Sequence, residues 1–309
     1  MTHPTSVRVR EVGPRDGIQS EKATVATADK IKLIHALQDS GLRFIEAVSF
    51  VSPKAVPQMA DAAEVWAGVQ RRDGVFYSAL VPNSKGAELA VDAGLDGLQV
   101  FIAATDSYNL KNVRKTVEDS LDDVAAVVLV AQGARLPVEG TISTAFGDPY
   151  EGDVEPKRVL DVSLRMWDLG ITAISYGDTT GMATPVRVRA LMETVREGLP
   201  SLDMNMHFHD TRGTALANVL QALELGIDYF DASVGGMGGS PFAQGATGNL
   251  VTEDLIHMLH DMDIETGVDL DALLKAAELA QAILPGDLPS KVLRAGPRYA
   301  VPGSGEEPD

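Results

Sequence analysis

The sequence alternates short apolar runs with amphipathic stretches over most of its length. Eight apolar runs are predicted to be β-strands, and they lie at residues 7–12, 44–48, 75–81, 97–102, 137–144, 173–176, 203–207 and 229–233. The amphipathic stretches between them are predicted to be helices, at residues 27–40, 61–70, 84–93, 117–132, 156–169, 185–197 and 211–225. Eight strands that alternate with helices are typical of an α/β protein, and they predict a (β/α)8 TIM barrel.

The main alternative to a barrel is a doubly wound open sheet. No G-x-G-x-x-G pattern follows the first apolar run and no P-loop pattern occurs in the sequence, which argues against the nucleotide-binding forms of that sheet. Two further helices are predicted after the eighth strand, at residues 252–262 and 269–282. Because no low-complexity linker divides the chain, we expect residues 1–309 to form a single domain, with an ordered core at about 7–295 and a disordered tail at 302–309.

Composition limits the class of protein. The chain has 309 residues, of which 45% are hydrophobic, and this is enough for a large core. It has no cysteine, which excludes disulfides, thiolate metal ligands and a cysteine nucleophile. No signal-peptide pattern opens the sequence and no apolar run approaches the roughly 18 residues that span a bilayer. We therefore expect a cytoplasmic protein without a membrane partner.

The charge of the chain limits its partners. The formal net charge of −18 argues against nucleic acid and against anionic membrane surfaces. An anionic ligand would need local positive charge, and Lys111, Arg114 and Lys115 supply a small basic cluster. The same cluster is also what a solvated loop would contain, so the sequence leaves both interpretations open.

Two histidines stand out near the end of the seventh predicted strand. His207 and His209 are two residues apart, and in a strand residues i and i+2 point to the same face. Two imidazoles on one face are a common way to hold a metal ion. A polar strand end with two solvated histidines would have the same spacing, so the pair needs support from elsewhere in the chain.

Further polar residues follow other predicted strands. Arg15 and Asp16 come after the first strand, Glu46 lies within the second, and a glycine-rich segment at 235–248 follows the eighth. A closed barrel makes strands one, two, seven and eight neighbours, and active sites of such barrels lie at the carboxyl ends of the strands. Individually, these features could be a surface turn, a buried Arg15–Glu46 ion pair and a flexible linker. Their convergence with the histidine pair favours a metal-dependent enzyme with a shaped or mobile loop over its site.

Several long segments resemble one known family. They are EVGPRDGIQSEK, IEAVSFVSPKAVPQMAD, GDPYEG, YGDTTGMATP, HFHDTRGTALAN and GGSPFAQGATGNLVTEDL. Together they resemble the 3-hydroxy-3-methylglutaryl-CoA lyase family, which belongs to the metal-dependent (β/α)8 carbon–carbon lyases and synthases. The resemblance covers about residues 7–295 and leaves no room for the additional carboxyl-terminal domains of the synthase branch.

The resemblance implies a divalent metal, Mg²⁺ or Mn²⁺, and an acyl-CoA substrate. Asp16, His207 and His209 match the family's metal ligands, and Asn249 matches the asparagine that completes the set. Lys22 matches a basic residue near the coenzyme A moiety. The expected reaction is a retro-Claisen cleavage of 3-hydroxy-3-methylglutaryl-CoA, or of a close 3-alkyl analogue, to acetyl-CoA and a 3-oxo acid such as acetoacetate. We also expect a homo-oligomer, a dimer.

The resemblance also assigns catalytic residues, with one departure. Arg15 matches the arginine that stabilises developing enolate charge, and Glu46 matches an essential glutamate near the metal. Ser240 occupies the position of a loop cysteine implicated in proton transfer. A serine hydroxyl ionises far less readily than a thiol, whose pKa is about 8.5. The alternatives are therefore a related barrel aldolase or lyase with another hydroxy-acid or acyl-CoA substrate, or a non-catalytic acyl-CoA-binding protein.

Overall fold

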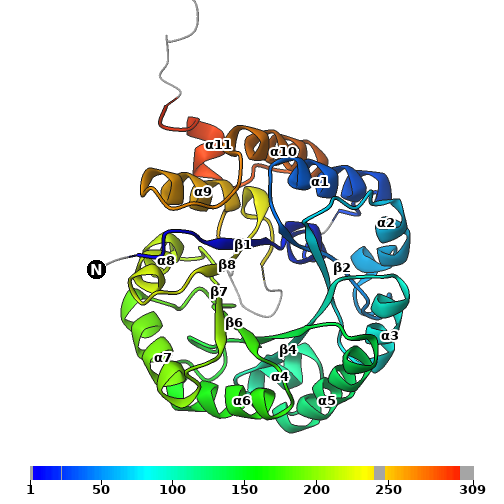
Figure 1. The fold of residues 1–309 in the computed structure, drawn as a ribbon, viewed down its shortest axis with the longest axis vertical. Helices are drawn as coiled ribbons and strands as arrows, with labels where there is room; N and C mark the ends of the chain where they lie inside the picture. Colours follow the sequence, from blue (N-terminus) through cyan, green and yellow to red (C-terminus); the bar gives the residue numbers. More distant parts are fainter. Residues whose placement is uncertain (1–2, 22, 240–247, 300–309) are drawn as a thin grey trace, which may run out of the picture.

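Eight parallel strands form a closed barrel in which each strand pairs with its neighbours in the sequence and β8 pairs with β1 (Figure 1). The computed structural model describes residues 3–21, 23–239 and 248–299. The strands are β1 (Arg8–Glu11), β2 (Phe44–Ser49), β3 (Phe76–Leu80), β4 (Gly97–Ala103), β5 (Val138–Ser143), β6 (Ala173–Gly177), β7 (Asp203–His207) and β8 (Tyr229–Ala232). Every predicted strand coincides with one of these, and the predicted TIM barrel is confirmed.

Helices surround the barrel as an outer ring (Figure 1). They are α1 (Thr27–Asp39), α2 (Ala62–Gly68), α3 (Ser84–Asp92), α4 (Asp106–Asn112), α5 (Val117–Ala134), α6 (Pro156–Asp168), α7 (Pro185–Gly198), α8 (Ala215–Glu224), α9 (Thr252–Asp261), α10 (Leu270–Ile283) and α11 (Lys291–Ala295). After β8 the chain forms α9 and α10, and α10 packs against α1. This contact covers the part of the ring where the first and last strands meet.

Three helices differ from the sequence prediction. The short helices α4 and α11 were not predicted, because seven and five residues are too few to show a helical period. The predicted helix at 211–225 begins only at Ala215, since Asp210 organises a turn before it. The Asp210 carbonyl accepts from Gly213 N at 3.0 Å, and its carboxylate accepts from Ala215 N at 3.1 Å.

The barrel interior contains a polar layer as well as apolar side chains. Arg10, Gln99, Asn205 and Asp231 are all buried, although they lie within strands. Strand register places two of them side by side with a histidine, because Asp231 on β8 pairs with Arg10 on β1 and with His207 on β7. Residues paired in this way point to the same side of the sheet. The register alone therefore brings an arginine, an aspartate and a histidine together inside the barrel.

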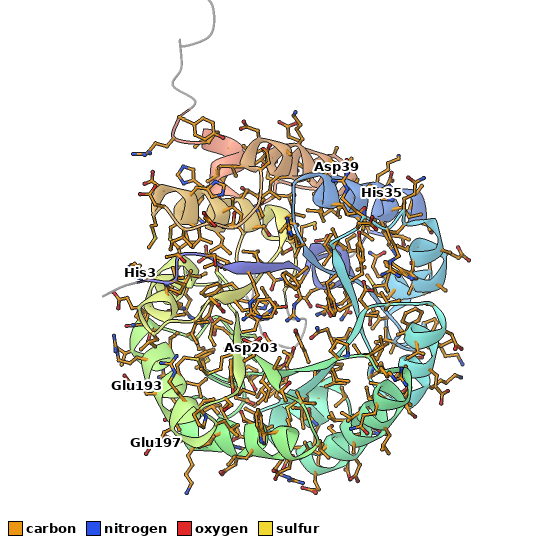
Figure 2. The ribbon with its side chains drawn as sticks, in the orientation of Figure 1. His3, His35, Asp39, Glu193, Glu197 and Asp203 are labelled. Atoms are coloured by element: carbon orange, nitrogen blue, oxygen red, sulfur yellow. The ribbon has the colours of Figure 1, made fainter. Side chains whose placement is uncertain are left out.

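The outer surface carries the acidic excess of the chain. Figure 2 shows Glu193 and Glu197 on the outward face of α7, where both are exposed. Opposite charges compensate locally at the amino-terminal end of the barrel, where Arg8 donates to Asp203 at 2.7 and 2.8 Å. Across the residues that the structure describes, no helix combines the length and the apolar character needed to span a membrane.

Candidate active site

A pocket of about 170 Å³ lies at the carboxyl ends of the strands. Residues on or after β1, β7 and β8 form one side of it, namely Asp16, His207, His209 and Asp231. Leu80 on β3, Phe101 on β4 and Tyr108 on α4 also line it. In a ring of eight strands, β3 and β4 stand opposite β7 and β8. The pocket therefore has a charged wall and, across the barrel mouth, a largely apolar one.

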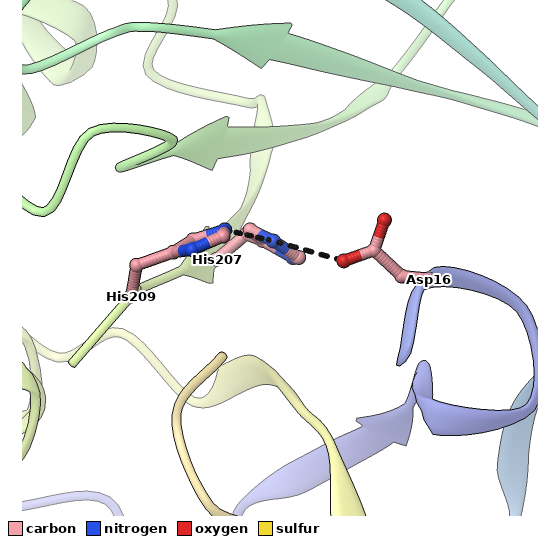
Figure 3. Close-up of side chains that lie close together, drawn as sticks. All are labelled: Asp16, His207 and His209. Atoms are coloured by element: carbon pink, nitrogen blue, oxygen red, sulfur yellow. Dashed lines mark hydrogen bonds and ion pairs between the residues drawn. The ribbon is translucent and has the colours of Figure 1, made fainter. Parts of the chain in front are cut away.

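Asp16, His207 and His209 form a compact group on the charged wall (Figure 3). One possible ligand atom from each lies within 4.8 Å of those from the other two. The Nε2 atoms of His207 and His209 are 3.3 Å apart, and His207 Nε2 is 4.0 Å from Asp16 Oδ2. The structure thus brings together three of the four residues that the resemblance identified as metal ligands.

A turn of π-helix at Gly13–Gly17 carries Asp16 toward the histidines. Asp16 N and Gly17 N both donate to the carbonyl of Val12, at 2.7 and 3.3 Å, so the turn follows β1 directly. A Cβ atom added at Gly17 would lie 2.8 Å from Met237 Cβ, and one added at Gly13 would lie 2.6 Å from Glu11 Oε1. The turn therefore requires glycine at both ends to lie against the segment after β8, and this position brings Asp16 close to β7.

Asn249 is adjacent to this group but contacts it through its amide nitrogen. Its Nδ2 donates to Asp16 Oδ2 at 2.8 Å and to the Met237 carbonyl at 2.9 Å, while its Oδ1 is buried and has no hydrogen-bond partner among the described residues. A backbone bridge pairs Asn249 with His209. An unsatisfied buried acceptor is costly unless something binds it. A cation beside Asp16 would be a suitable partner for this oxygen.

Arg15 and Glu46 form a bidentate ion pair next to the ligand group. Arg15 Nε and Nη2 donate to the two Glu46 carboxylate oxygens at 2.9 and 2.8 Å, and Nη1 donates to Asp16 Oδ1 at 2.5 Å. The Glu46 side chain is only 2% exposed, so it needs the partner that Arg15 provides. A guanidinium has five N–H groups. Arg15 lines the pocket, and within residues 3–21, 23–239 and 248–299 these three bonds leave two of its N–H groups for a ligand.

The protonation of His209 and Asp16 suits cation binding. Burial opposes protonation of His207, but Asp231 and Asp16 outweigh it and raise the pKa of this imidazole above its usual value, so a cation would have to displace its proton. Burial and the neighbouring His207 lower the pKa of His209 to about 3, so its imidazole is neutral near pH 7. Burial opposes ionisation of Asp16, but Arg15 and His207 outweigh it and lower the pKa of the carboxyl below its usual value. Two ligand atoms at about 2.1 Å from one ion and at right angles lie roughly 3.0 Å apart. The 3.3 Å between the two Nε2 atoms is close to that separation, so the residues fit a divalent ion.

Sequence reasoning missed Asp231, which lines the pocket and contacts His207. Its Oδ2 lies 3.1 Å from His207 Nδ1, on the far side of the ring from Asp16. The available signal was an aspartate within the apolar strand predicted at 229–233, because a buried carboxylate requires partners. The partners come from other strands, and the sequence does not show which.

Two predicted site residues, Lys22 and Ser240, lie outside the described residues. The basic cluster lies on and just after α4, where Lys111 and Arg114 are exposed and Lys115 forms an ion pair with Asp123. None of these three cations is among the described residues that line the pocket.

A family model described as HMGL-like matches residues 6–280. The chain belongs to the HMGL-like family. It is 44% identical over 294 residues to hydroxymethylglutaryl-CoA lyase YngG of Bacillus subtilis, covering 95% of this chain and 98% of that one. It is 45% identical over 284 residues to the 3-hydroxy-3-isohexenylglutaryl-CoA/hydroxymethylglutaryl-CoA lyase of Pseudomonas aeruginosa, covering 92% and 95% of the two chains. The predicted family is confirmed.

Solved structures of HMGL-like proteins have the same fold. An HMG-CoA lyase from Acinetobacter baumannii, solved in complex with coenzyme A and 3-methylmalate, superposes with a TM-score of 0.92 at 41% identity, over 97% of this chain and 99% of that chain. The carboxyl transferase domain of Rhizobium etli pyruvate carboxylase superposes at 0.69 with 19% identity, over 91% of this chain and 47% of that chain, and it shares the fold alone.

Proposed function

We propose that this protein is a divalent-metal-dependent carbon–carbon lyase that cleaves 3-hydroxy-3-methylglutaryl-CoA, or a close 3-alkyl analogue, to acetyl-CoA and a 3-oxo acid. The observation that carries the proposal is the Asp16–His207–His209 group beside the Arg15–Glu46 pair, in one pocket at the carboxyl end of the barrel. Membership of the HMGL-like family and 44–46% identity to HMG-CoA lyases support the reaction.

Four residues would hold the metal in this proposal: Asp16, His207, His209 and Asn249. Oxygen ligands with two imidazoles suit Mg²⁺ or Mn²⁺, which would polarise the substrate's tertiary hydroxyl and lower its pKa. Glu46 is our candidate for accepting the hydroxyl proton. Each of its oxygens accepts one bond from Arg15 and retains a lone pair for another donor.

Removal of that proton starts the cleavage. The hydroxyl carbon becomes a ketone, its bond to the carbon next to the thioester breaks, and the electron pair stays on the thioester fragment as an enolate. The two remaining N–H groups of Arg15 would donate to this charge, and the Arg15 side chain itself is only 12% exposed. A proton then adds to the enolate carbon to give acetyl-CoA, and Ser240, or a water that it positions, is our candidate donor.

A coupled assay of acetyl-CoA release tests the function directly. The protein should be inactive after exhaustive chelation and should cleave the 3-methyl thioester once Mn²⁺ or Mg²⁺ is restored. Binding of the thioester without any turnover, with either metal, would instead indicate a non-catalytic acyl-CoA-binding protein. Turnover of non-thioester hydroxy acids alone would indicate an aldolase of the same fold.

A second candidate is a lyase for a bulkier substituent on the hydroxyl-bearing carbon. The relative from Pseudomonas aeruginosa is named for an isohexenyl as well as a methyl substrate. If the substrate oxygens face Asp16 and the histidines, the substituent faces the wall of Leu80, Phe101 and Tyr108. The ratio of kcat/KM for isohexenyl and methyl substrates decides between the candidates. Phe101→Ala should shift that ratio toward the larger group if this wall contacts it.

Three further assignments stay predictions. We propose coenzyme A thioesters as the substrate class because the relative from Acinetobacter baumannii was solved with coenzyme A. The homodimer and the cytoplasmic location were expected at the outset. Sedimentation of the purified protein would measure the oligomeric state, and fractionation of the source cells would test the location.

A further inference from the structure

Asp231 is surrounded by donors inside the barrel. Its Oδ1 accepts from Arg10 Nε at 2.8 Å and from Asn205 Nδ2 at 2.7 Å. Its Oδ2 accepts from Arg10 Nη2 at 2.9 Å and from Ser175 Oγ at 3.1 Å, and it lies 3.1 Å from His207 Nδ1. The side chain is 3% exposed. The Arg10 and Asn205 nitrogens can only donate, so Asp231 is held as the ionised carboxylate, which acts only as an acceptor.

This environment determines which nitrogen of His207 carries hydrogen. Because Asp231 can only accept, His207 Nδ1 must donate to it. The lone pair of the neutral ring is then on Nε2, which faces His209 Nε2 at 3.3 Å and Asp16 Oδ2 at 4.0 Å. The same contact also limits rotation of the ring about its Cβ–Cγ bond.

We propose that Asp231 is a positioning residue for the metal: it orients His207 so that its Nε2 lone pair faces the ion, and Arg10 holds Asp231 in place for this task. The inference rests on the proposed metal site, but Asp231 is not itself one of the predicted metal ligands. Strand register supports it, because Arg10, Asp231 and His207 are direct cross-strand neighbours on β1, β8 and β7. Histidine ligands of metals commonly donate their other N–H to a carboxylate, and loss of that partner typically weakens metal affinity by about 10- to 100-fold.

The competing interpretation is that the network only closes the barrel. Arg10 and Asp231 connect the first strand to the last, and a buried ion pair across this seam would stabilise the fold without any metal. Both interpretations predict that changes at Asp231 lower stability. They differ in what happens to His207 and to metal affinity in protein that is still folded.

The variant Asp231→Asn distinguishes the two interpretations, and Ser175→Ala is the matched control. Asparagine keeps the shape of the side chain but replaces one acceptor with an amide that repels the His207 Nδ1–H. Ser175→Ala removes another donor to the same Asp231 oxygen and leaves the histidine contact intact. Mn²⁺ affinity is measured by titration calorimetry on metal-free protein, at a temperature where thermal melts show all variants folded. We expect affinity to fall about 10- to 100-fold in Asp231→Asn and less than about 3-fold in Ser175→Ala.

The ¹⁵N resonances of His207 in metal-free wild-type protein provide a second measurement that needs no variant. At a pH high enough for the His207 ring to be neutral, the proposal requires hydrogen on Nδ1 and a lone pair on Nε2. The opposite tautomer, or equal Mn²⁺ affinities in folded wild type and Asp231→Asn, would overturn it. A wild type that binds no Mn²⁺ would refute the proposed metal site and the role of Asp231 with it, whereas a wild type that binds Mn²⁺ no better than folded Asp231→Asn would refute the role of Asp231 alone. If Asp231→Asn does not fold, the wild-type resonances still test whether Asp231 accepts from His207 Nδ1, and the opposite tautomer overturns the proposal.

Discussion

Replacing Arg15 with glutamine tests the assignment of its spare N–H groups to transition-state charge. Three of the five N–H groups of Arg15 bond to Glu46 and Asp16, and the remaining two can reach a ligand in the pocket. Loss of one donor to a developing oxyanion lowers kcat by about 10²–10³, or about 2.7–4 kcal/mol of barrier. Because glutamine retains one amide donor but lacks the charge, we expect Arg15→Gln to lose at least this much.

The same change also affects stability, and the assay must separate the two effects. Glu46 is 2% exposed and would lose both of its charge-assisted donors. Removing one partner of such a buried pair costs about 3–5 kcal/mol. Melting curves should therefore set the assay temperature, so that the variant remains folded throughout the kinetic measurements.

Steady-state kinetics on the 3-methyl thioester with saturating Mn²⁺ then give kcat and KM separately. Charge that develops only in the transition state affects kcat, so kcat should fall much more than KM rises. Arg8→Gln is the matched control, because Arg8 also forms a bidentate pair, with Asp203, at the opposite end of the barrel. An Arg15→Gln enzyme with normal kcat and raised KM would show that Arg15 binds the ground state. Equal losses of turnover in both variants would show that only stability had changed.

Three further predictions follow from other residues. His209→Ala should bind Mn²⁺ at least about 10-fold more weakly than wild type in calorimetry, and unchanged affinity would remove His209 from the ligand set. Ser240→Cys should raise the rate on the 3-methyl substrate and confer sensitivity to alkylating reagents. Ser240→Ala should lower the rate if the hydroxyl relays a proton. An unchanged rate in both variants would exclude Ser240 from proton transfer. Burial raises the pKa of Glu11 to about 7. The contribution of the neutral carboxyl to stability is therefore complete below its ordinary pKa of 4.5 and is lost as the pH rises through 7. Between pH 5 and pH 8, the free energy of unfolding measured in urea should fall by about 2–3 kcal/mol more in wild type than in Glu11→Gln. Parallel pH profiles of the two proteins would contradict the raised pKa.

The strand pattern was sufficient to predict the barrel because parallel strands covered by helices leave short, largely apolar runs, even where a polar layer interrupts them. All eight strands were predicted near their observed positions. The short helices α4 and α11 were missed because they contain too few residues to show a helical period. The start of α8 was predicted too early, because the side chain and carbonyl of Asp210 form a turn in a segment whose apolar spacing resembles that of a helix. These details depend on local hydrogen bonds that apolar periodicity does not encode.

The site was predicted in part for a related reason. The histidine pair could be predicted because residues i and i+2 of a strand share a face. Asp16 could be predicted to lie near the pair because the order of strands in a barrel places its segment beside them. The role of Asp231 was not visible, because its partners Arg10, Ser175 and Asn205 lie on three other strands at a register that only the structure defines. The orientation of Asn249 likewise depends on atomic packing: its amide nitrogen donates to Asp16, and its oxygen has no partner within the part of the chain that the structure describes.

The hydrogen bond between Asp16 and Asn249 joins residues 233 positions apart, and this separation determines when the site can form during synthesis. A chain leaving the ribosome would expose the first predicted ligand long before the histidines and the asparagine, so no amino-terminal fragment that ends before residue 249 contains the complete set. The barrel seam between β8 and β1 closes over the same interval. In the proposed site, the complete ligand set exists only once residue 249 has been made, so a bound ion would stabilise the finished barrel but could not guide the assembly of its first half.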